Sequence, residues 1–584
     1  MLPSVRHKLY RQCLCQLTPR PHGPSESYPA LTELQTTSPP QSVRALYLSN
    51  WKVHHNSNRL GVRLTGPQPE WSRKSGGEAG LHPSNIHDAP YSIGSVSFTG
   101  DEAVVLGCDG PSLGGFVVLC VVCSADLWKM GQVRPGDTIR FDPVDVATAI
   151  GLERDLDKAI ETLSPLEALE GIPSDEAALV QKLGRIPAAL GTIKHDGQRV
   201  TVLQAGDRAF LLEFGDASAF NLRHNFEISA FCENHEKKPI PGVEELTPGV
   251  FSLHVTYTRG LSSELMLSRL ADHIRSYKVP SQVPSRSVRL PIAFDDSISR
   301  AAIERYTATI RPNAPWLPSN IDFLQKLNGI PNLTKVLSAA EFVVLGLGDV
   351  FMGSPCAIPL DPRHRLFGTK YNPSRSFTPR GAVGIGGQYM CIYATDSPGG
   401  YQLVGRTVEI WDADLVDTEA WFFRRFDRIS FYPVTEAALD GTARSELVQI
   451  SDGVLDLEQY ETWLTTNKED ITAAADQQAR AISNAPFVDE LVLPYQVEPV
   501  VNGHSPSLDS SGLRGERVKA TMPGRCYKVM VKEGSVVEKG DVLVCIESSK
   551  MEVEIRSPVG GKCVAVLVQA GDLIDVEDEL VVVE

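Results

Sequence analysis

The sequence predicts a mainly β protein with α+β parts, divided into several domains. Short segments that alternate between apolar and polar residues and end in glycine or proline dominate residues 43–150 and 341–408. Helical apolar spacing is found in fewer stretches, such as 262–278. Residues 518–584 contain an internal near-repeat of short strands. A chain of 584 residues has room for about three to five domains.

Composition excludes some classes of partner. Hydrophobic residues make up 42% of the chain and charged residues 22%, as in ordinary globular proteins. The net charge of −16 argues against nucleic acid as the main partner. The longest apolar run, residues 116–123, has the length of a strand and is too short to cross a bilayer. We therefore expect no nucleic-acid partner and no membrane span.

Cysteine usage and the first residues bear on the compartment. The eleven cysteines form no framework, and Cys120 and Cys123 lie in an apolar run, which favours two buried thiols over a metal or redox pair. A reducing, cytoplasmic location is expected. Residues 1–42 carry several Arg and Lys and no acidic residue before Glu26, so we expect a disordered or presequence-like segment; a mitochondrial presequence is the less favoured alternative.

The C-terminal unit has two related halves. KEGSVVEKGDVLV (532–544) and QAGDLIDVEDELV (569–581) share one pattern of glycine turn, apolar step, acidic turn and apolar strand. Two such halves predict a pseudo-twofold β-sandwich, with Lys550 at the tip of a tight hairpin between them. Residues 500–514 are rich in Ser and Gly, which is typical of a flexible tether. An exposed lysine on a tethered unit is suited to carrying a covalent cofactor such as biotin or lipoamide.

This unit resembles biotin carboxyl carrier domains, because Met551 follows Lys550 within a symmetric hairpin. Ser549 departs from the methionine that usually precedes the lysine. Lipoyl domains share the fold but usually have acidic residues flanking their lysine. The resemblance implies a biotinyl/lipoyl-type β-sandwich with biotin on Lys550, attached by a biotin protein ligase; a lipoyl group or an unmodified lysine are the alternatives.

Two further regions resemble the carboxyltransferase modules of the urea carboxylase and fungal urea amidolyase family. The first includes GGEAGLHPSNIHDAPYSIGSVSFTGD (76–101) and DGPSLGGFV (109–117); the second is residues 346–407. The same modules occur in the two-subunit oxoprolinase and in the sporulation kinase inhibitor–antagonist pair, and their barrels are cyclophilin-like. The implied domains are a disordered or presequence-like segment (1–42), a partial antagonist-like module (43–150), the α+β part of an inhibitor-like module (165–286), its cyclophilin-like barrel (287–445), a helix and tether (446–517) and the carrier domain (518–584).

The resemblance implies a function. It is the transfer of a carboxyl group from biotin on Lys550 to urea, which gives allophanate. The chain shows no biotin carboxylase region, so ATP, bicarbonate and Mg would act only through such a region on another domain or subunit. The match begins abruptly near Ser49, so we expect the C-terminal part of a longer enzyme. Two alternatives stay open: another amide acceptor such as guanidine or a lactam, and a truncated non-catalytic binding or regulatory subunit. Assembly into a homo-oligomer also stays open.

Two motifs supply candidate acceptor-site residues in the first module. HPSN offers His82 and Asn85, an imidazole and an amide on a Pro-containing loop that suit the carbonyl and amine groups of urea. The alternative is that Asn85 only caps a turn. DGPSLGG offers Asp109 and glycines that allow close approach to backbone N–H groups, as an anionic carboxyl group requires. The alternative is a tight turn before a buried strand.

The second module offers a basic cluster. DPRHR contains Arg363 and His364, and arginines of this kind clamp carboxylates. A solvated loop with internal ion pairs is the alternative. Arg380 and Gln388 are weaker candidates. No metal-ligand motif and no phosphate-binding loop is present in the sequence.

Overall fold

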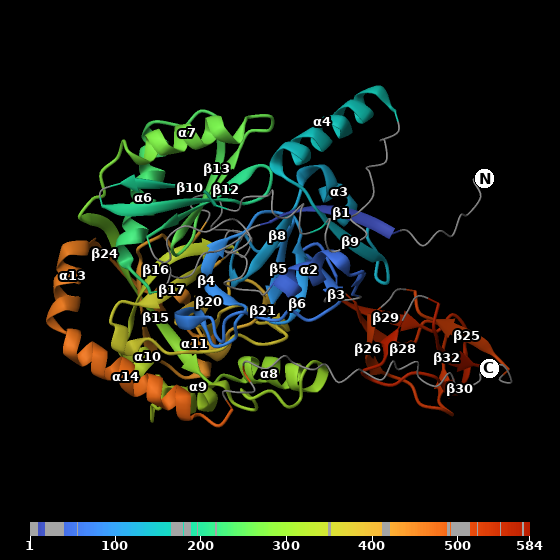
Figure 1. Ribbon diagram of the computed structural model, residues 1–584. Helices are drawn as coiled ribbons and strands as arrows, with labels where there is room; N and C mark the ends of the chain where they lie inside the picture. Colours follow the sequence, from blue (N-terminus) through green and yellow to red (C-terminus); the bar gives the residue numbers. More distant parts are fainter. Residues whose placement is uncertain are drawn as a thin grey trace.

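The computed structural model arranges the chain as two β-barrels, an α+β unit and a small C-terminal β unit (Figure 1). All structural statements below concern the residues that it describes. These are 10–17, 40–54, 57–164, 179, 189–195, 197–215, 219–348, 352–411, 421–487, 491, 514–521, 524–548, 551–574 and 577–584.

The first barrel closes in the strand order β1-β8-β5-β6-β3-β2-β9. Its strands are β1 (Tyr10–Leu17), β2 (Trp51–Val53), β3 (Gly61–Thr65), β5 (Ser95–Thr99), β6 (Glu102–Leu106), β8 (Val118–Val122) and β9 (Thr138–Pro143). The barrel interior is filled by side chains such as Val96, Phe98 and Phe141, which are at most 2% exposed. The predicted strand at 116–123 and its buried Cys120 belong to this core.

The N-terminal segment differs from its expectation. Residues Tyr10–Leu17, within the range predicted to be disordered or presequence-like, form β1, which pairs in parallel with β9 and antiparallel with β8. The physical reason is that β8 and β9 would otherwise each leave one edge of backbone N–H and C=O groups unpaired, and one added strand satisfies both edges. Alternation within residues 10–17 is too weak to show this from sequence.

Short helices flank the first barrel. They are α2 (Pro40–Leu48), η1 (Gly77–Ala79), η2 (Ser124–Asp126), α3 (Leu127–Met130) and α4 (Val146–Thr162). Trp51 ties α2 to the barrel because its indole N–H donates to the Leu46 carbonyl at 2.9 Å. The α4 helix begins at Asp145, whose carboxylate accepts from the Thr148 N–H. Among the helices of the described ranges, none is long and apolar enough to cross a membrane.

The α+β unit packs two helices on a five-stranded sheet of order β10-β11-β12-β14-β13. The elements are β10 (Ala189–His195), β11 (Gln198–Gln204), β12 (Ala209–Phe214), α6 (Leu222–Lys237), β13 (Val243–Pro248), β14 (Ser252–Tyr257) and α7 (Ser263–Ile274). The amphipathic helix predicted at 262–278 is α7, capped by the Ser262 hydroxyl. Met266 and Leu270 of α7 are fully buried against the sheet.

The second barrel repeats the topology of the first. The strands run in the order β22-β19-β20-β17-β16-β23-β15, and β15 also pairs with β22. Each strand of the first barrel has a counterpart in the second whose number is fourteen higher, and the strand order around the two rings is the same. The parallel pair β1–β9 of the first barrel corresponds to the parallel pair β15–β23 of the second. Its strands are β15 (Gln282–Phe294), β16 (Glu341–Gly348), β17 (Ser354–Pro359), β19 (Ala382–Gly386), β20 (Tyr389–Ile392), β22 (Gln402–Arg406) and β23 (Arg428–Pro433).

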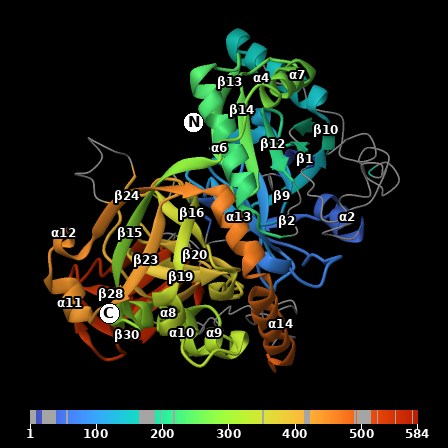
Figure 2. The same cartoon turned by 90° about the vertical axis from the view of Figure 1, so that its left-hand side faces the viewer.

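Helices and one extra strand surround the second barrel. They are α8 (Ser297–Thr309), α9 (Asn320–Asn328), α10 (Leu333–Ala339), η3 (Pro362–His364), α11 (Glu436–Gly441), α12 (Arg444–Leu447), β24 (Gln449–Asp456), α13 (Leu457–Thr466) and α14 (Lys468–Asn484). The strand β24 pairs with β15, so the first part of the region predicted as helix and tether belongs to this sheet. Figure 2 shows α13 and α14 along one side of the barrel. The tether predicted at 500–514 lies, except for Arg514, outside the described residues.

The C-terminal unit is a β-sandwich with internal twofold symmetry. One sheet has the order β25-β32-β30-β27 and the other β29-β28-β26-β31. The first half of the unit holds β25 to β28 and the second half holds β29 to β32. When each strand is exchanged for its counterpart in the other half, four numbers away, one sheet order becomes the other. The strands are β25 (Glu516–Lys519), β26 (Gly524–Val529), β27 (Val536–Val537), β28 (Val542–Ser548), β29 (Met551–Arg556), β30 (Gly561–Val566), β31 (Leu573–Ile574) and β32 (Glu579–Val583). The predicted mainly β fold with α+β parts is confirmed.

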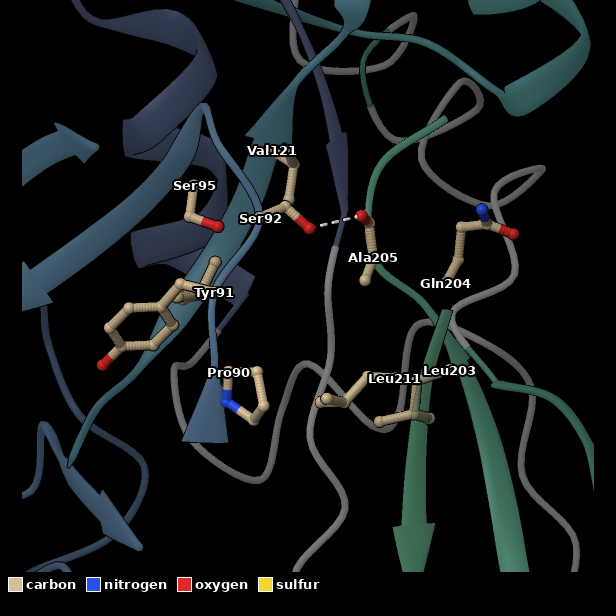
Figure 3. Close-up of a pocket in the computed structure, with 10 residues that line it drawn as sticks. Pro90, Tyr91, Ser92, Ser95, Val121, Leu203, Gln204, Ala205 and Leu211 are labelled. Atoms are coloured by element: carbon tan, nitrogen blue, oxygen red, sulfur yellow. Dashed lines mark hydrogen bonds between the residues drawn. The ribbon is translucent and has the colours of Figure 1, made fainter. Parts of the chain in front are cut away.

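A buried histidine joins the α+β unit to the first barrel. The Ser92 hydroxyl lies 2.7 Å from His254 Nε2 and 2.7 Å from the Ala205 carbonyl oxygen, beside a small pocket of about 30 Å³ between the two units (Figure 3). Such a volume suits about one water molecule. Burial lowers the pKa of His254 to about 4.

This histidine predicts a pH dependence of stability. Between about pH 6.5 and 4 the unfolded chain protonates His254 while the folded chain does not, so the unfolded state binds more protons and folding weakens as the pH falls. The loss is expected to reach about 3 kcal/mol near pH 4. Urea unfolding of wild type and His254→Gln from pH 7 to 4.5 checks this: the glutamine variant should lack that part of the slope, and equal slopes would contradict it.

Candidate active site

The candidate active site lies where the first barrel meets the second, on the strand β4 (Asn85–Pro90). All six residues of β4 are buried. The strand pairs with β7 (Leu113–Phe116), and the register shifts between Asn85 and Ala89. Irregular strands of this kind re-aim side chains next to active sites. In Figure 1, β4 lies beside β20 of the second barrel. The strand thereby brings Asn85, His87 and Asp88 to the junction.

An acid–lysine–tyrosine cluster spans the junction. Asp88 Oδ1 lies 3.4 Å from Lys370 Nζ, and Asp88 Oδ2 accepts a hydrogen bond of 3.1 Å from the Tyr401 hydroxyl. Lys370 is 2% exposed, and its ammonium also donates to the Gly115 carbonyl at 2.9 Å. Its Nζ lies 5.0 and 5.4 Å from the ring centroids of Phe116 and Tyr401. A cation held by a carboxylate, a carbonyl and two ring faces is fixed in place before any ligand binds.

The approach of Lys370 requires a glycine on β7. A Cβ added at Gly115 would lie 1.9 Å from Lys370 Nζ and 2.3 Å from Asp88 Oδ1. Any other residue at this position would displace the ion pair. The glycines of DGPSLGG were expected to admit a ligand to the backbone. In the structure, Gly115 admits a lysine of the second module.

A histidine and a second tyrosine form the next contact across the junction. His87 Nδ1 is hydrogen-bonded to the Tyr389 hydroxyl, and the His87 ring packs edge-on against Phe251 at 4.6 Å. Burial raises the pKa of Tyr389 well above its usual range. Burial, followed by the charge of Asp88, does the same to the pKa of Tyr401. Both phenols therefore keep their protons, and Tyr401 donates a hydrogen bond to the Asp88 carboxylate.

Two amide side chains at the junction lack partners within the described part of the chain. Asn85 is fully buried, and neither its Oδ1 nor its Nδ2 makes a hydrogen bond there. Gln388 is 8% exposed, and its Oε1 is likewise unbonded. One loop separates them: a Cβ at Gly80 would lie 2.4 Å from Asn85 Nδ2, and a Cβ at Gly387 would lie 2.3 Å from the Ala79 carbonyl oxygen. Buried amide atoms without partners are costly, so these two residues are candidates for contact with a polar ligand.

His82 takes part in a bridging network. Its Nδ1 lies 2.8 Å from the Ser84 hydroxyl and its Nε2 lies 3.6 Å from Asp101. Asp101 accepts a 2.9 Å hydrogen bond from the Asn372 amide of the second module. These contacts couple the HPSN loop to the loop that carries Lys370. His82 therefore helps to hold the HPSN loop against the second module.

Three predicted residues are not brought to the Asp88 cluster. Asp109 pairs at 2.6 Å with Arg59, whose side chain is 81% exposed on the surface. Arg363 pairs at 2.7 Å with Asp361, the N-cap of η3. His364 is half-buried in the same turn, where its Nδ1 has no hydrogen-bond partner among the described residues. This arrangement corresponds to the alternative of a loop with internal ion pairs.

Sequence reasoning missed Lys370, Tyr389 and Tyr401. Both tyrosines directly follow glycine turns, in GGQY and PGGY, and this was the available signal. Lys370 stands among buried aromatic and small residues in FGTKYNP, which is unusual for a lysine. Nothing local indicates its partner, because Asp88 precedes it by 282 residues.

The C-terminal unit offers the second element of the site. Strands β28 and β29 pair antiparallel with Ser548 opposite Met551, so that Ser549 and Lys550 form the link between them. Both link residues lie outside the described part of the chain. A primary amine in the short link of a paired hairpin fits a covalently attached biotin, which needs a nucleophilic nitrogen clear of the sandwich core.

Three family models match separate parts of the chain. "Carboxyltransferase domain, subdomain A and B" matches residues 19–143, and "Carboxyltransferase domain, subdomain C and D" matches residues 200–422. "Biotin-requiring enzyme" matches residues 516–583. The first match starts well before Ser49, where the resemblance was expected to begin. The last one indicates a covalently attached biotin, as predicted.

Related proteins agree over most of the chain. The urea amidolyase of Saccharomyces cerevisiae is 41% identical over 548 residues, covering 89% of this chain and 29% of that protein. A putative urea carboxylase of Emericella nidulans is 32% identical, covering 89% of this chain and 45% of that protein. The crystal structure of Kluyveromyces lactis urea carboxylase superposes with a TM-score of 0.83 at 36% identity, covering all of this chain and 51% of that one.

The chain thus spans about a third to a half of the length of these relatives. Within that span it contains both halves of a carboxyltransferase domain, followed by a biotin-requiring domain. Its fold matches that of the Kluyveromyces lactis crystal structure. The chain belongs, by these domains and by its similarity to them, to the family of the urea amidolyases and urea carboxylases.

Proposed function

We propose that this chain transfers a carboxyl group from biotin on Lys550 to urea, giving allophanate. The observation that carries the proposal is the buried junction between the barrels. There, Asp88, which contacts Lys370 and Tyr401 of the second module, lies on the same strand as Asn85, whose amide is unbonded among the described residues. Relatives named urea amidolyase and urea carboxylase support the choice of urea.

The cluster has the groups that such a transfer needs. One bond would form between a urea nitrogen and the carboxyl carbon, and the bond from that carbon to the biotin nitrogen would break. The proton lost by the urea nitrogen would pass, by way of the assigned base, to the biotin nitrogen. The Asp88 carboxylate is the base we assign to that proton, and Lys370 and Tyr401 are the donors we assign to oxygen atoms that gain charge. Biotin, when bound, supplies the carboxyl group. Burial of Asp88 and Lys370 keeps water away from the transfer.

The unbonded Asn85 amide favours urea over guanidine as the acceptor. Asn85 offers one acceptor and one donor group. Urea has N–H donors and one carbonyl acceptor, so it satisfies both kinds of group. Guanidinium has donors only and would leave Asn85 Nδ2 unbonded. We therefore expect the wild-type chain, supplied with a biotin carboxylase component, to carboxylate urea and to discriminate against guanidine.

Asn85→Leu separates this binding role from a structural one. Leucine has a similar volume and removes two unbonded polar atoms, so stability should stay the same or rise by about 1 kcal/mol. Urea carboxylation should nevertheless fall about 10- to 100-fold in kcat/KM. Thermal unfolding and urea-dependent carboxylation measure the two effects.

Gln204→Leu is the matched control. Gln204 is also buried with an unbonded Oε1, but it lies in the α+β unit, where its Nε2 donates to the Gly206 carbonyl. Gln204→Leu removes this hydrogen bond, so the stability of the variant should fall. Its kinetic constants for urea should stay unchanged. If Asn85→Leu kept wild-type urea kinetics, the assignment of the acceptor site would be wrong.

The proposal includes partners outside this chain. A biotin carboxylase domain or subunit would use ATP, bicarbonate and Mg to charge the biotin, and a biotin protein ligase would attach it. We further propose a cytoplasmic location, since nine of the eleven cysteines, those from Cys108 to Cys563, are free thiols. A non-catalytic binding role remains the second candidate. Urea turnover by the reconstituted system would exclude it.

A further inference from the structure

We propose that Arg375 is a positioning residue for the carboxyl transfer, which holds the two chain segments that carry Lys370 and Tyr401. The inference rests on the function proposed above and adds a residue to its site. Arg375 is the first residue of β18 (Arg375–Thr378), which pairs with β21 (Ser397–Gly399). It is 1% exposed and is among the largest fully buried side chains of the described residues.

The lysine and the tyrosine of the cluster lie on two backbone segments, residues 369–371 and 400–403, which we call the wall. The two segments are bonded to each other, because the Tyr371 N–H donates to the Gly400 carbonyl at 2.6 Å. Both also reach Asp88 through side chains, one through the ammonium and the other through the phenol. A shift of either segment would therefore move a donor group away from the proposed base.

The Arg375 side chain contacts both segments of the wall. Its Nη1 donates to the Tyr401 carbonyl at 2.7 Å, and its guanidinium carbon lies 4.3 Å from the Tyr371 ring centroid. Its Nε donates to the Thr378 hydroxyl at 3.3 Å, which orients the guanidinium on its own strand. A planar guanidinium can stack on a ring and donate hydrogen bonds at the same time. One side chain thus fixes the position of one segment relative to the other.

Packing alone does not account for an arginine at this position. Among the described residues, Arg375 forms no ion pair with a carboxylate, and its Nη2 has no hydrogen-bond partner. Taking a charge out of water without an opposite charge is costly, and an apolar side chain of similar length would fill the space at a lower cost. The contacts with the wall are what the charged side chain adds.

A second buried side chain joins the same two segments. Asn320 Oδ1 accepts hydrogen bonds from the Tyr371 hydroxyl and from the Leu403 N–H, both at 2.8 Å. Asn320 begins α9 and is 1% exposed. The wall is thus tied to α9 by Asn320 and to β18 by Arg375. Loss of Arg375 is therefore expected to loosen the wall without unfolding the barrel.

The sequence around Arg375 matches the acceptor loop of the first module. HPSN (82–85) and NPSR (372–375) each place a Pro-Ser pair directly before the first residue of a strand, β4 in one module and β18 in the other. The numbers of these strands differ by fourteen, as do those of the matching barrel strands. Arg375 is therefore the counterpart of Asn85 in the repeated topology. Asn85 offers its amide to the proposed acceptor, and Arg375 donates to the wall instead.

Kinetics of the full chain, supplied with a biotin carboxylase component, test the role in transfer. Arg375→Met should lower kcat about 10- to 100-fold, because misplaced donors stabilise the transition state less. The KM for urea should stay within about twofold, because Asn85 is unchanged. Arg375→Lys keeps the charge and one donor for the Tyr401 carbonyl, so its kcat should exceed that of Arg375→Met at least about threefold. An unchanged kcat in Arg375→Met, a rise in KM in place of the fall in kcat, or no gain from lysine would overturn the proposal.

Arg425→Met is the matched control for the methionine variant. Arg425 belongs to the same module and has the same kinds of contact: it donates to the Leu345 carbonyl at 3.0 Å, and its guanidinium carbon lies 5.4 Å from the Phe426 ring centroid. Its loss should leave kcat near that of the wild type. Equal falls in kcat for the two methionine variants would point to a general loss of packing and overturn the proposal.

Hydrogen exchange followed by mass spectrometry tests the hold on the wall without any activity. In Arg375→Met, peptides that cover residues 369–371 and 400–403 should exchange about tenfold faster than in the wild type, and in Arg425→Met they should exchange at the wild-type rate. Unchanged exchange in Arg375→Met would overturn the positioning role. Faster exchange in that variant, with no urea turnover by the reconstituted wild type, would support the hold of Arg375 on the wall and refute the proposed function instead.

Discussion

Arginine in place of Lys550 is expected to abolish both biotin attachment and carboxyl transfer. Attachment forms an amide from a neutral primary amine, and the guanidinium group stays protonated and cannot react in this way. The size and charge of the side chain are otherwise similar, so the sandwich should fold normally. A streptavidin blot and peptide mass spectrometry around residue 550 measure attachment. Urea-dependent carboxylation in the reconstituted system measures transfer.

Lys562→Arg is the matched control for this change. Lys562 is an exposed lysine on β30 of the same unit, and its replacement should leave biotin content and transfer unchanged. Biotin on Lys550→Arg, or a lipoyl group on the wild-type lysine, would contradict the assigned cofactor site. Transfer that survives in Lys550→Arg would exclude the proposed mechanism.

Lys370→Met is expected to remove most of the transfer activity and to destabilise the junction between the barrels. Methionine fills the space of the lysine stem, but Asp88 then keeps the Tyr401 hydroxyl and loses its ammonium partner. Loss of a preorganised donor typically costs about 10²- to 10³-fold in kcat. Leaving one half of a buried ion pair typically costs about 3 to 5 kcal/mol of stability. Carboxylation kinetics and chemical unfolding measure the two effects.

A paired variant distinguishes catalysis from stability. Asp88→Asn with Lys370→Met removes both charges, so most of the lost stability should return while transfer stays low. Lys129→Met is the control: it breaks a 2.6 Å ion pair with Asp126 elsewhere in the first module and should leave transfer near wild type. If the paired variant regained activity along with stability, the cluster would be structural only.

The proposed acceptor site and the Asp88–Lys370–Tyr401 cluster were visible from the sequence to different degrees. Asn85 was predicted as an acceptor-site residue from HPSN, and its unbonded amide at the junction supports that prediction. Asp109, Arg363 and His364 were chosen because charged and basic residues near glycine or proline turns often bind anions. The structure instead places them in surface turns, two of them in ion pairs with Arg59 and Asp361. Local patterns describe a turn well, but they do not tell which surface the turn faces.

What the sequence by itself determined is the class of fold, the carrier unit and the family. Alternating short strands, the repeat in residues 518–584 and the Lys550–Met551 pair are local features, because strand pairing within a hairpin or a small sandwich depends on neighbours in the chain. Tertiary structure alone decided the cluster. Asp88 and Lys370 are 282 residues apart, and each becomes a partner of the other only because two barrels of the same topology pack through β4 and β7. A buried lysine has no local signal, since its stability there depends on charges and rings supplied by another module.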